Sequence, residues 1–269
     1  MPHLQLPTAN LYYEVHEPLN GSAQRTPLVL LAGLASDSMS WRAMVHGLRQ
    51  ERKVITLDNR GCGRTEADED ITLVQMAKDC LALCDHLGVA SVDLLGHSMG
   101  GFIALQIAHL APARVNRMVL CNSSVVQYPR NLMMLKDWAD DLDRDGPTAR
   151  WYRTFFYWIL TPEFFEDSQT VNDLVELALS YEHGPTARGF RAQVNAMAEL
   201  DPRPWLPEIQ TPTLVITANE DLLLPPGPDA AGLSELPRVT VKRVDGVGHS
   251  MPTEAPRRLN DLALAFLDG

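Results

Sequence analysis

The chain has 269 residues, of which 45% are hydrophobic and 21% charged, as is typical of a globular protein with one large or two small domains. Its net charge of −11 comes without a basic stripe, which argues against nucleic acid or an anionic membrane surface as a partner. The longest apolar run, residues 28–35, is far shorter than the ~20 residues of a membrane span, and residues 1–5 do not start a secretory signal.

Apolar runs bounded by Gly, Pro and Asn alternate with amphipathic segments along the first 124 residues, which is the pattern of strands connected by helices. The predicted strands of this part are 11–15, 27–31, 54–57, 92–95 and 117–121, and the predicted helices are 71–87 and 102–110. Residues 125–204 contain no strand-like run, and they are rich in large aromatic side chains. Strands return at 212–217 and 239–244, and a last amphipathic helix covers 256–267.

Strands that alternate with helices form a parallel sheet that the helices cover on both faces. We therefore predict an α/β core made of residues 1–124 and 205–269, with a helical cap, residues 125–204, inserted into it. A chain of this length is long enough for such a core to enclose a pocket.

The most informative motif is Gly96-His97-Ser98-Met99-Gly100, which lies between a predicted strand and the helix that follows it. A serine at Gly-x-Ser-x-Gly spacing in this context is typical of a nucleophile held on a strained turn. The flanking glycines allow the turn because a Cβ at either position would collide with neighbouring backbone. Ser98 is therefore the predicted nucleophile, and His97 is expected to point away from it.

A serine nucleophile requires a base that takes its proton and a carboxylate that orients the base. His249 and Asp221 each follow a late predicted strand, at the carboxyl ends where open α/β sheets build their sites. Glu220 and Asp245 compete with Asp221 for the role of the acid. Some proteins of this architecture place the acid one strand earlier, but Asn122 occupies that position here and carries no charge. We therefore predict His249 as the base and Asp221 as the orienting acid.

The tetrahedral intermediate of acyl transfer requires hydrogen-bond donors for its oxyanion. One predicted donor is the backbone N–H of Met99, which follows the nucleophile in the chain. The other is the backbone N–H of Leu34, in the loop after the predicted strand 27–31.

These motifs together resemble the α/β-hydrolase fold superfamily, across essentially the whole chain. They are Gly-His-Ser-Met-Gly-Gly at 96–101, Asp-Asn-Arg-Gly-Cys-Gly-Arg at 58–64, Asn-Glu-Asp at 219–221 and Gly-His at 248–249. Within the superfamily, residues 1–6, 120–123 and 158–164 are similar to the branch of 3-oxoadipate enol-lactonases and carboxylesterases. The chain departs from the pattern at Ala32-Gly33, where many members have His-Gly in the loop that supports the oxyanion site.

The resemblance implies an α/β-hydrolase fold, with a mostly parallel central sheet flanked by helices and an inserted helical cap. It implies a serine hydrolase that cleaves a carboxylic ester or lactone through an acyl-enzyme, without a metal or an organic cofactor. The expected partner is a small to medium, apolar substrate molecule. Four cysteines without a Cys-x-x-Cys pair are too few for a disulfide scaffold, so we expect a reduced, cytoplasmic protein.

Other functions of the same architecture retain part of this apparatus. Carbon–carbon hydrolases of aromatic-ring breakdown commonly have Asn before the serine, where this chain has His97. Acyltransferases and cofactor-free haloperoxidases keep the serine, whereas dehalogenases and epoxide hydrolases use Asp as the nucleophile, which Ser98 argues against. Some members of the fold act as ligand receptors, including some with an intact triad, and slow turnover with ligand retention would distinguish them.

The predicted cap has a cluster of aromatic side chains, some of which pack it against the core. Trp151, Phe155 and Trp158 are candidates for the wall of an apolar substrate pocket over the serine. Arginines of the cap could instead bind a substrate carboxylate, as a lactonase on a dicarboxylate pathway would require; the candidates are Arg153, Arg188 and Arg191.

Overall fold

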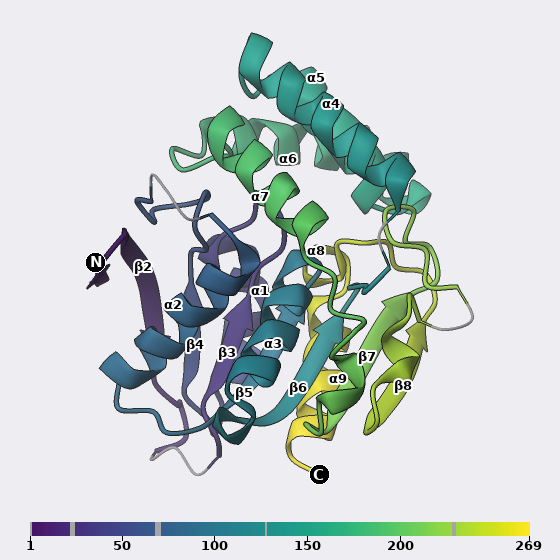
Figure 1. Ribbon diagram of the computed structural model, residues 1–269. Helices are drawn as coiled ribbons and strands as arrows, with labels where there is room; N and C mark the ends of the chain where they lie inside the picture. Colours follow the sequence, from purple (N-terminus) through teal and green to yellow (C-terminus); the bar gives the residue numbers. More distant parts are fainter. Residues whose placement is uncertain (1, 22–24, 68–70, 127, 228–229) are drawn as a thin grey trace.

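The structure is a computed structural model that describes residues 2–21, 25–67, 71–126, 128–227 and 230–269. Its centre is a sheet with the strand order β1-β2-β4-β3-β5-β6-β7-β8 (Figure 1). The strands are β1 (His3–Leu6), β2 (Ala9–His16), β3 (Leu28–Leu31), β4 (Val54–Leu57), β5 (Val92–His97), β6 (Val115–Cys121), β7 (Thr213–Ala218) and β8 (Val239–Val244). β2 runs antiparallel to both of its neighbours, and every pair from β4 to β8 is parallel.

Helices cover both faces of this sheet. They are α1 (Arg42–Leu48), α2 (Leu73–His86), α3 (Met99–Leu110), α8 (Met251–Glu254) and α9 (Pro256–Leu267). In β3, Val29 and Leu31 pack in an apolar cluster with α2 and α3, whereas Leu28 and Leu30 pack in a second cluster with α1 and α9. Successive side chains of a strand point to opposite faces, so a fully apolar strand such as β3 requires a helical layer on each side.

Four further helices lie between β6 and β7 in the chain and form a layer over one end of the sheet (Figure 1). These helices, which we call the helical insertion, are α4 (Pro129–Asp145), α5 (Ala149–Ile159), α6 (Ser168–Ser180) and α7 (Ala187–Glu199). The side chains of Thr148, Asp167 and Thr186 accept hydrogen bonds from the first turns of α5, α6 and α7, which determines where these helices begin. Short 3₁₀ turns connect other elements, at Ser38–Trp41, Pro112–Arg114, Pro162–Glu166, Leu206–Glu208 and Leu233–Glu235.

The α/β class and the mostly parallel sheet flanked by helices are confirmed, but some elements differ from the sequence-based expectation. β1 and α1 were not predicted, because β1 is a short edge strand with the polar residues His3 and Gln5, and α1 has only seven residues. α3 begins at Met99 rather than at residue 102, because the turn at Ser98 leads directly into the helix.

The four cysteines are free thiols, and all of them are buried: Cys62, Cys80, Cys84 and Cys121. Burial raises the pKa of the Cys62 and Cys121 thiols, so these two stay protonated near neutral pH. Among the helices that the structure describes, none combines the length and the apolar character needed to cross a bilayer.

Candidate active site

Ser98 occupies a strained turn between β5 and α3, with φ of 53° and ψ of −119°. A non-glycine residue rarely adopts a positive φ, and such strain is typical of functional positions. The turn requires glycines on both sides: a Cβ on Gly96 would overlap the main chain of Gly100, and a Cβ on Gly100 would overlap the carbonyl group of Leu31. The Gly-x-Ser-x-Gly spacing is therefore a steric requirement of this geometry.

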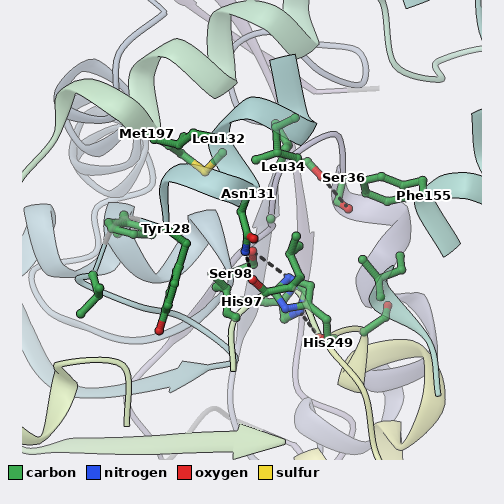
Figure 2. Close-up of a pocket in the computed structure, with 18 residues that line it drawn as sticks. Leu34, Ser36, His97, Ser98, Tyr128, Asn131, Leu132, Phe155, Met197 and His249 are labelled. Atoms are coloured by element: carbon green, nitrogen blue, oxygen red, sulfur yellow. Dashed lines mark hydrogen bonds between the residues drawn. The ribbon is translucent and has the colours of Figure 1, made fainter. Parts of the chain in front are cut away.

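A chain of hydrogen bonds joins the three side chains that the sequence singled out. His249 Nε2 lies 2.9 Å from Ser98 Oγ (Figure 2), and His249 Nδ1 lies 2.8 Å from Asp221 Oδ2. The other carboxylate oxygen, Asp221 Oδ1, accepts a hydrogen bond of 2.7 Å from the backbone N–H of Leu224. All three side chains are buried, with the serine at the floor of a cavity. The residues come from the ends of β5, β7 and β8, which lie at the same edge of the sheet.

The competing acidic residues do not reach the histidine. Glu220 and Asp245 are exposed, and Asp245 pairs with the side chain of Asn219 instead. Asn122 lies at the alternative acid position but uses its amide to donate hydrogen bonds to the carbonyls of Gly248 and His249, at 2.8 and 2.9 Å. Asp221 is therefore the carboxylate that the fold brings to His249.

His97 has a part in the site that the sequence analysis missed. We expected it to point away from the serine, but it lines the same cavity, and its Nε2 lies 2.8 Å from the carbonyl oxygen of His249. A carbonyl only accepts, so His97 Nε2 carries the proton and donates it. Desolvation, followed by the proximity of His249, lowers the pKa of His97 to about 3, so the ring is neutral at physiological pH. Its place beside the nucleophile in the motif was the signal that could have found it.

Glu254 connects the histidine loop to the helical insertion, and nothing in the sequence motifs indicated this role. Its Oε2 accepts from the backbone N–H of Gly248 at 2.9 Å, and its Oε1 accepts from the N–H and the hydroxyl of Thr161 at 2.8 and 2.7 Å. The backbone N–H of Ser250 also donates to the carbonyl of Ile159, at 2.8 Å. The loop that carries the histidine is thus bonded to the end of α5 at several points.

The two residues that carry the predicted oxyanion donors lie at the same cavity as the serine or next to it in the chain. Met99 is the first residue of α3, so its N–H lies in the first turn, where helix N–H groups have no partner within the helix. Leu34 follows β3 in the chain and lines the cavity next to Ser98. A Cβ on Gly33 would lie 3.2 Å from the Cβ of Ser98, so this loop approaches the serine closely. The position of both groups fits the predicted role, which remains a prediction.

The cavity beside Ser98, which we call the first cavity, has a volume of about 100 Å³ (Figure 2). The insertion contributes much of its wall, through α4, α5 and α7, and the apolar part includes Leu132, Leu135, Phe155, Ile159 and Met197. Among the described residues that line it, none is a lysine, an arginine or an acid. The first cavity is therefore suited to an apolar, uncharged group.

Of the three aromatic residues predicted to line this pocket, only Phe155 does so. Trp151 lies one helical turn earlier, stacks on Phe155 and lines a neighbouring cavity instead. The prediction for Trp158 is wrong, because the described lining of neither cavity includes it; its ring packs against the Arg130 guanidinium of α4, at 5.0 Å.

The predicted carboxylate-binding arginines lie outside both cavities. Arg153 donates to the side chain of Asn172 at 2.9 Å, and Arg191 forms an ion pair with Asp140 at 2.8 Å. Arg188 lines a separate polar depression near Gly61. The described lining of the two cavities includes none of these arginines, so the structure gives no support to this alternative.

The described part of the chain contains no cluster of three His, Cys, Asp or Glu side chains that could hold a metal ion. The arrangement in hand is instead one of a hydroxyl, an imidazole that can take its proton, and a buried carboxylate behind the imidazole. This arrangement can activate a serine for attack on a carbonyl carbon.

Known proteins resemble this chain in sequence and in structure. A family model described as alpha/beta hydrolase fold matches residues 26–256. A protein of Variovorax paradoxus (strain S110), provisionally named carbamate hydrolase RutD, is 31% identical over 80% of this chain and 80% of its own length. A thermophilic esterase from Thermogutta terrifontis is 25% identical, covers 100% of this chain and 98% of its own, and has a TM-score of 0.85. The enol-lactonase from Burkholderia xenovorans LB400 has a TM-score of 0.84 at 24% identity over 100% of both chains, which shows the shared fold.

The sheet order, the serine on the turn after β5 and the histidine after β8 define an enzyme of the α/β-hydrolase type. The chain belongs to the alpha/beta hydrolase fold family, which its match over residues 26–256 shows directly. It is a hydrolase of the α/β fold.

Proposed function

We propose that the protein hydrolyses uncharged carboxylic esters or lactones of small to medium size, with Ser98, His249 and Asp221 as a catalytic triad. The observation that carries this proposal is the hydrogen-bonded chain from Ser98 Oγ through His249 to Asp221, which opens into an apolar cavity. Residues 125–204 act in this proposal as a cap that encloses the substrate over the serine.

The reaction proceeds in two halves. Ser98 Oγ attacks the ester carbonyl while His249 Nε2 takes the hydroxyl proton, and the backbone N–H groups of Leu34 and Met99 stabilise the oxyanion. Asp221 stabilises the imidazolium that forms. His249 then donates the proton to the leaving alcohol, which departs and leaves the acyl group on the serine. In the second half, His249 takes a proton from water, the resulting hydroxide attacks the acyl-enzyme, and the carboxylic acid leaves as the proton returns to Ser98.

The lining of the first cavity supports an uncharged substrate over a carboxylate-bearing lactone. A dicarboxylate substrate would bury a negative charge, and a buried charge requires a partner of opposite sign. The three arginines that could supply one are engaged or placed elsewhere. The lactones that fit this proposal are therefore neutral ones.

A carbamate is the second candidate substrate class, because the relative from Variovorax paradoxus is named for that activity. A carbamate carbonyl carries an oxygen and a nitrogen substituent, and a serine can attack it as it attacks an ester. The described lining also includes the polar side chains of Tyr128 and Asn131, which could contact a carbamate nitrogen, so hydrolysis rates of matched esters and carbamates decide between the two classes.

The test is the hydrolysis of p-nitrophenyl acyl esters, from acetate to decanoate, by the wild type and by Ser98→Ala. We expect multiple turnover that the substitution abolishes, and the best acyl length will give the size of the acyl site. A wild type that turns over no ester faster than Ser98→Ala would reject the proposal. Neutral carbamates, carbon–carbon substrates and tight ligand retention would then be examined in that order.

A further inference from the structure

A second cavity adjoins the first and is larger, with a volume of about 310 Å³ against about 100 Å³. Its apolar wall comes from α5 and α6 of the helical insertion, and includes Trp151, Phe156, Leu174 and Ala178. The mechanism above uses none of these residues. Leu177, which is 66% exposed, also lines this cavity and marks its opening to solvent.

The two cavities share four lining residues, namely Ser36, Phe155, Ile159 and Ser250. Phe155 and Ile159 are four residues apart on α5, so they lie on the same face of the helix and form one boundary between the cavities. Figure 2 shows Phe155 next to Ser36 at one side of the first cavity, on the side away from Tyr128. The two cavities therefore meet along the phenyl ring of Phe155.

The Phe155 ring is held in place by its neighbours. Trp151 stacks on it with a centroid distance of 5.5 Å and an interplanar angle of 7°, and Trp138 contacts it edge-on at 5.3 Å. Such aromatic pairs add stability beyond the area that they bury. The ring is thus a fixed partition, and its size determines how far a group in one cavity can extend into the other.

The polar end of the second cavity contains a buried carboxyl group, that of Asp37, and burial raises its pKa. Asp37 is 6% exposed, accepts a hydrogen bond from the Tyr181 hydroxyl at 2.5 Å and accepts another from the N–H of Met39 at 2.9 Å. Among the described residues that line this cavity, His183 is the one basic side chain, and neither lysine nor arginine is present. A carboxylate-bearing group would find neither a lysine nor an arginine as a partner in this described lining, whereas an uncharged apolar group requires no such partner.

We propose that the second cavity is a binding site for one arm of the substrate, an apolar group without negative charge, and that Phe155 limits how far this arm extends from Ser98. This inference rests on the proposed function, because an ester has an acyl arm and an alcohol arm on either side of the reacting carbonyl. One arm fills the first cavity, and the other passes Phe155 into the second. The site therefore accepts esters whose two arms differ in size.

The test compares two substitutions that change the second cavity in opposite directions. Phe155→Ala removes the partition, and Ala178→Phe fills the second cavity from its opposite wall without reaching the first. Two substrate series vary one arm each: p-nitrophenyl esters of increasing acyl length, and alkyl butyrates of increasing alcohol length. In one series we expect Phe155→Ala to raise the ratio of kcat/KM for the longest over the shortest ester about tenfold, and Ala178→Phe to lower it about tenfold. The control is Phe164→Ala, on the 3₁₀ turn outside both cavities, which should leave both ratios unchanged.

A binding measurement separates failure of this inference from failure of the proposed function. The neutral fluorophore N-phenyl-1-naphthylamine is titrated into Ser98→Ala and into the double variant Ser98→Ala/Ala178→Phe. We expect the added phenyl group to weaken binding about tenfold. If no ester is hydrolysed but this difference is found, the proposed function fails and the binding site stands. If esters are hydrolysed while neither ratio nor the fluorophore affinity responds to the substitutions, the second cavity is not a substrate site and the inference is overturned.

Discussion

The substitution Asp221→Asn tests how the buried carboxylate acts, because the structure determines how the amide must lie. Leu224 N–H points at Asp221 Oδ1 from 2.7 Å, and a backbone N–H accepts no hydrogen bond. The amide oxygen of an asparagine must therefore face Leu224, and its NH₂ group must face His249 Nδ1. The ring then keeps Nδ1 unprotonated and carries its proton on Nε2, which is the nitrogen that lies 2.9 Å from Ser98 Oγ. In this tautomer His249 cannot take the serine proton.

We expect kcat to fall ~10⁴-fold, the size of effect measured when the acid of another serine hydrolase triad is changed to asparagine. Four decades in rate correspond to about 5.4 kcal/mol of lost transition-state stabilisation, at 1.36 kcal/mol for each decade. The assay is steady-state hydrolysis of the best p-nitrophenyl ester, with the urea unfolding midpoint measured in parallel. Glu220→Gln is the matched control, since Glu220 is exposed on the adjacent position and should retain full activity.

Two results would refute this reasoning. An Asp221→Asn variant that is folded and retains activity within about tenfold of the wild type would show that the carboxylate does not set the tautomer of His249. A loss of similar size in Glu220→Gln would show that a different carboxylate orients the ring. A Leu224→Pro substitution is unsuitable as a further check, because proline changes the backbone as well as removing the donor.

Four further predictions concern the surroundings of the site. Glu254→Gln should lower kcat about 10-fold. The NH₂ group of the glutamine would face the N–H of Gly248 or of Thr161, and a buried donor without an acceptor costs about 1–3 kcal/mol. An unchanged kcat would contradict a positioning role for Glu254. His97 binds a proton in the unfolded chain but stays neutral in the folded one down to about pH 3, so it makes the protein less stable as the pH falls from about 6.5 to about 3. His97→Asn should flatten the acid limb of the unfolding free energy by up to about 1.4 kcal/mol per pH unit, and an identical slope in urea titrations would contradict this. Gly100→Ala should destabilise the fold by about 3 kcal/mol or more, because its Cβ would overlap a main-chain carbonyl of β3; a thermal midpoint equal to that of the wild type would contradict the geometry. Finally, monomethyl adipate should be hydrolysed with a kcat/KM about tenfold or more below that of methyl hexanoate, because the described lining of the two cavities contains no lysine or arginine. Equal values would contradict the preference for uncharged substrates.

The parts of the site that the sequence predicted are those in which a local steric rule limits the residue type. The turn at Ser98 has a positive φ and close backbone contacts at Gly96 and Gly100, so the motif is readable without any alignment. His249 and Asp221 were identifiable because each follows an apolar strand, and the carboxyl ends of parallel strands meet at one edge of the sheet. The sequence favoured Asp221 over its acidic neighbours by its position after the strand, and the structure separates it from them by its burial and its hydrogen bond to His249.

The parts that could not be predicted depend on contacts between segments far apart in the chain. Trp151 lines the second cavity, Phe155 lines both cavities and Trp158 lines neither, although the three residues are close to one another in sequence. Helical periodicity gives the face of α5 but not what that face meets, because α4 and α7 determine where the space lies. The surroundings of the arginines could not be predicted for the same reason. Arg191, for example, forms an ion pair with Asp140 of α4, at 2.8 Å.

The contacts at the end of α5 connect substrate selection to catalysis. Phe155 and Ile159 line both cavities. The carbonyl of Ile159 accepts a hydrogen bond from Ser250 in the loop that carries His249, and Thr161 is connected to this loop through the carboxylate of Glu254. A side chain that only lines a cavity can change without moving this loop, so Phe155 substitutions should alter substrate preference and leave the rate of the preferred ester nearly intact. Thr161 shares the Glu254 carboxylate with the histidine loop, so a change there should affect every ester alike. If Phe155→Ala changes the relative kcat/KM values of the esters, and Thr161→Val lowers kcat/KM for all of them equally, then α5 determines substrate choice and the end of α5 determines the position of His249.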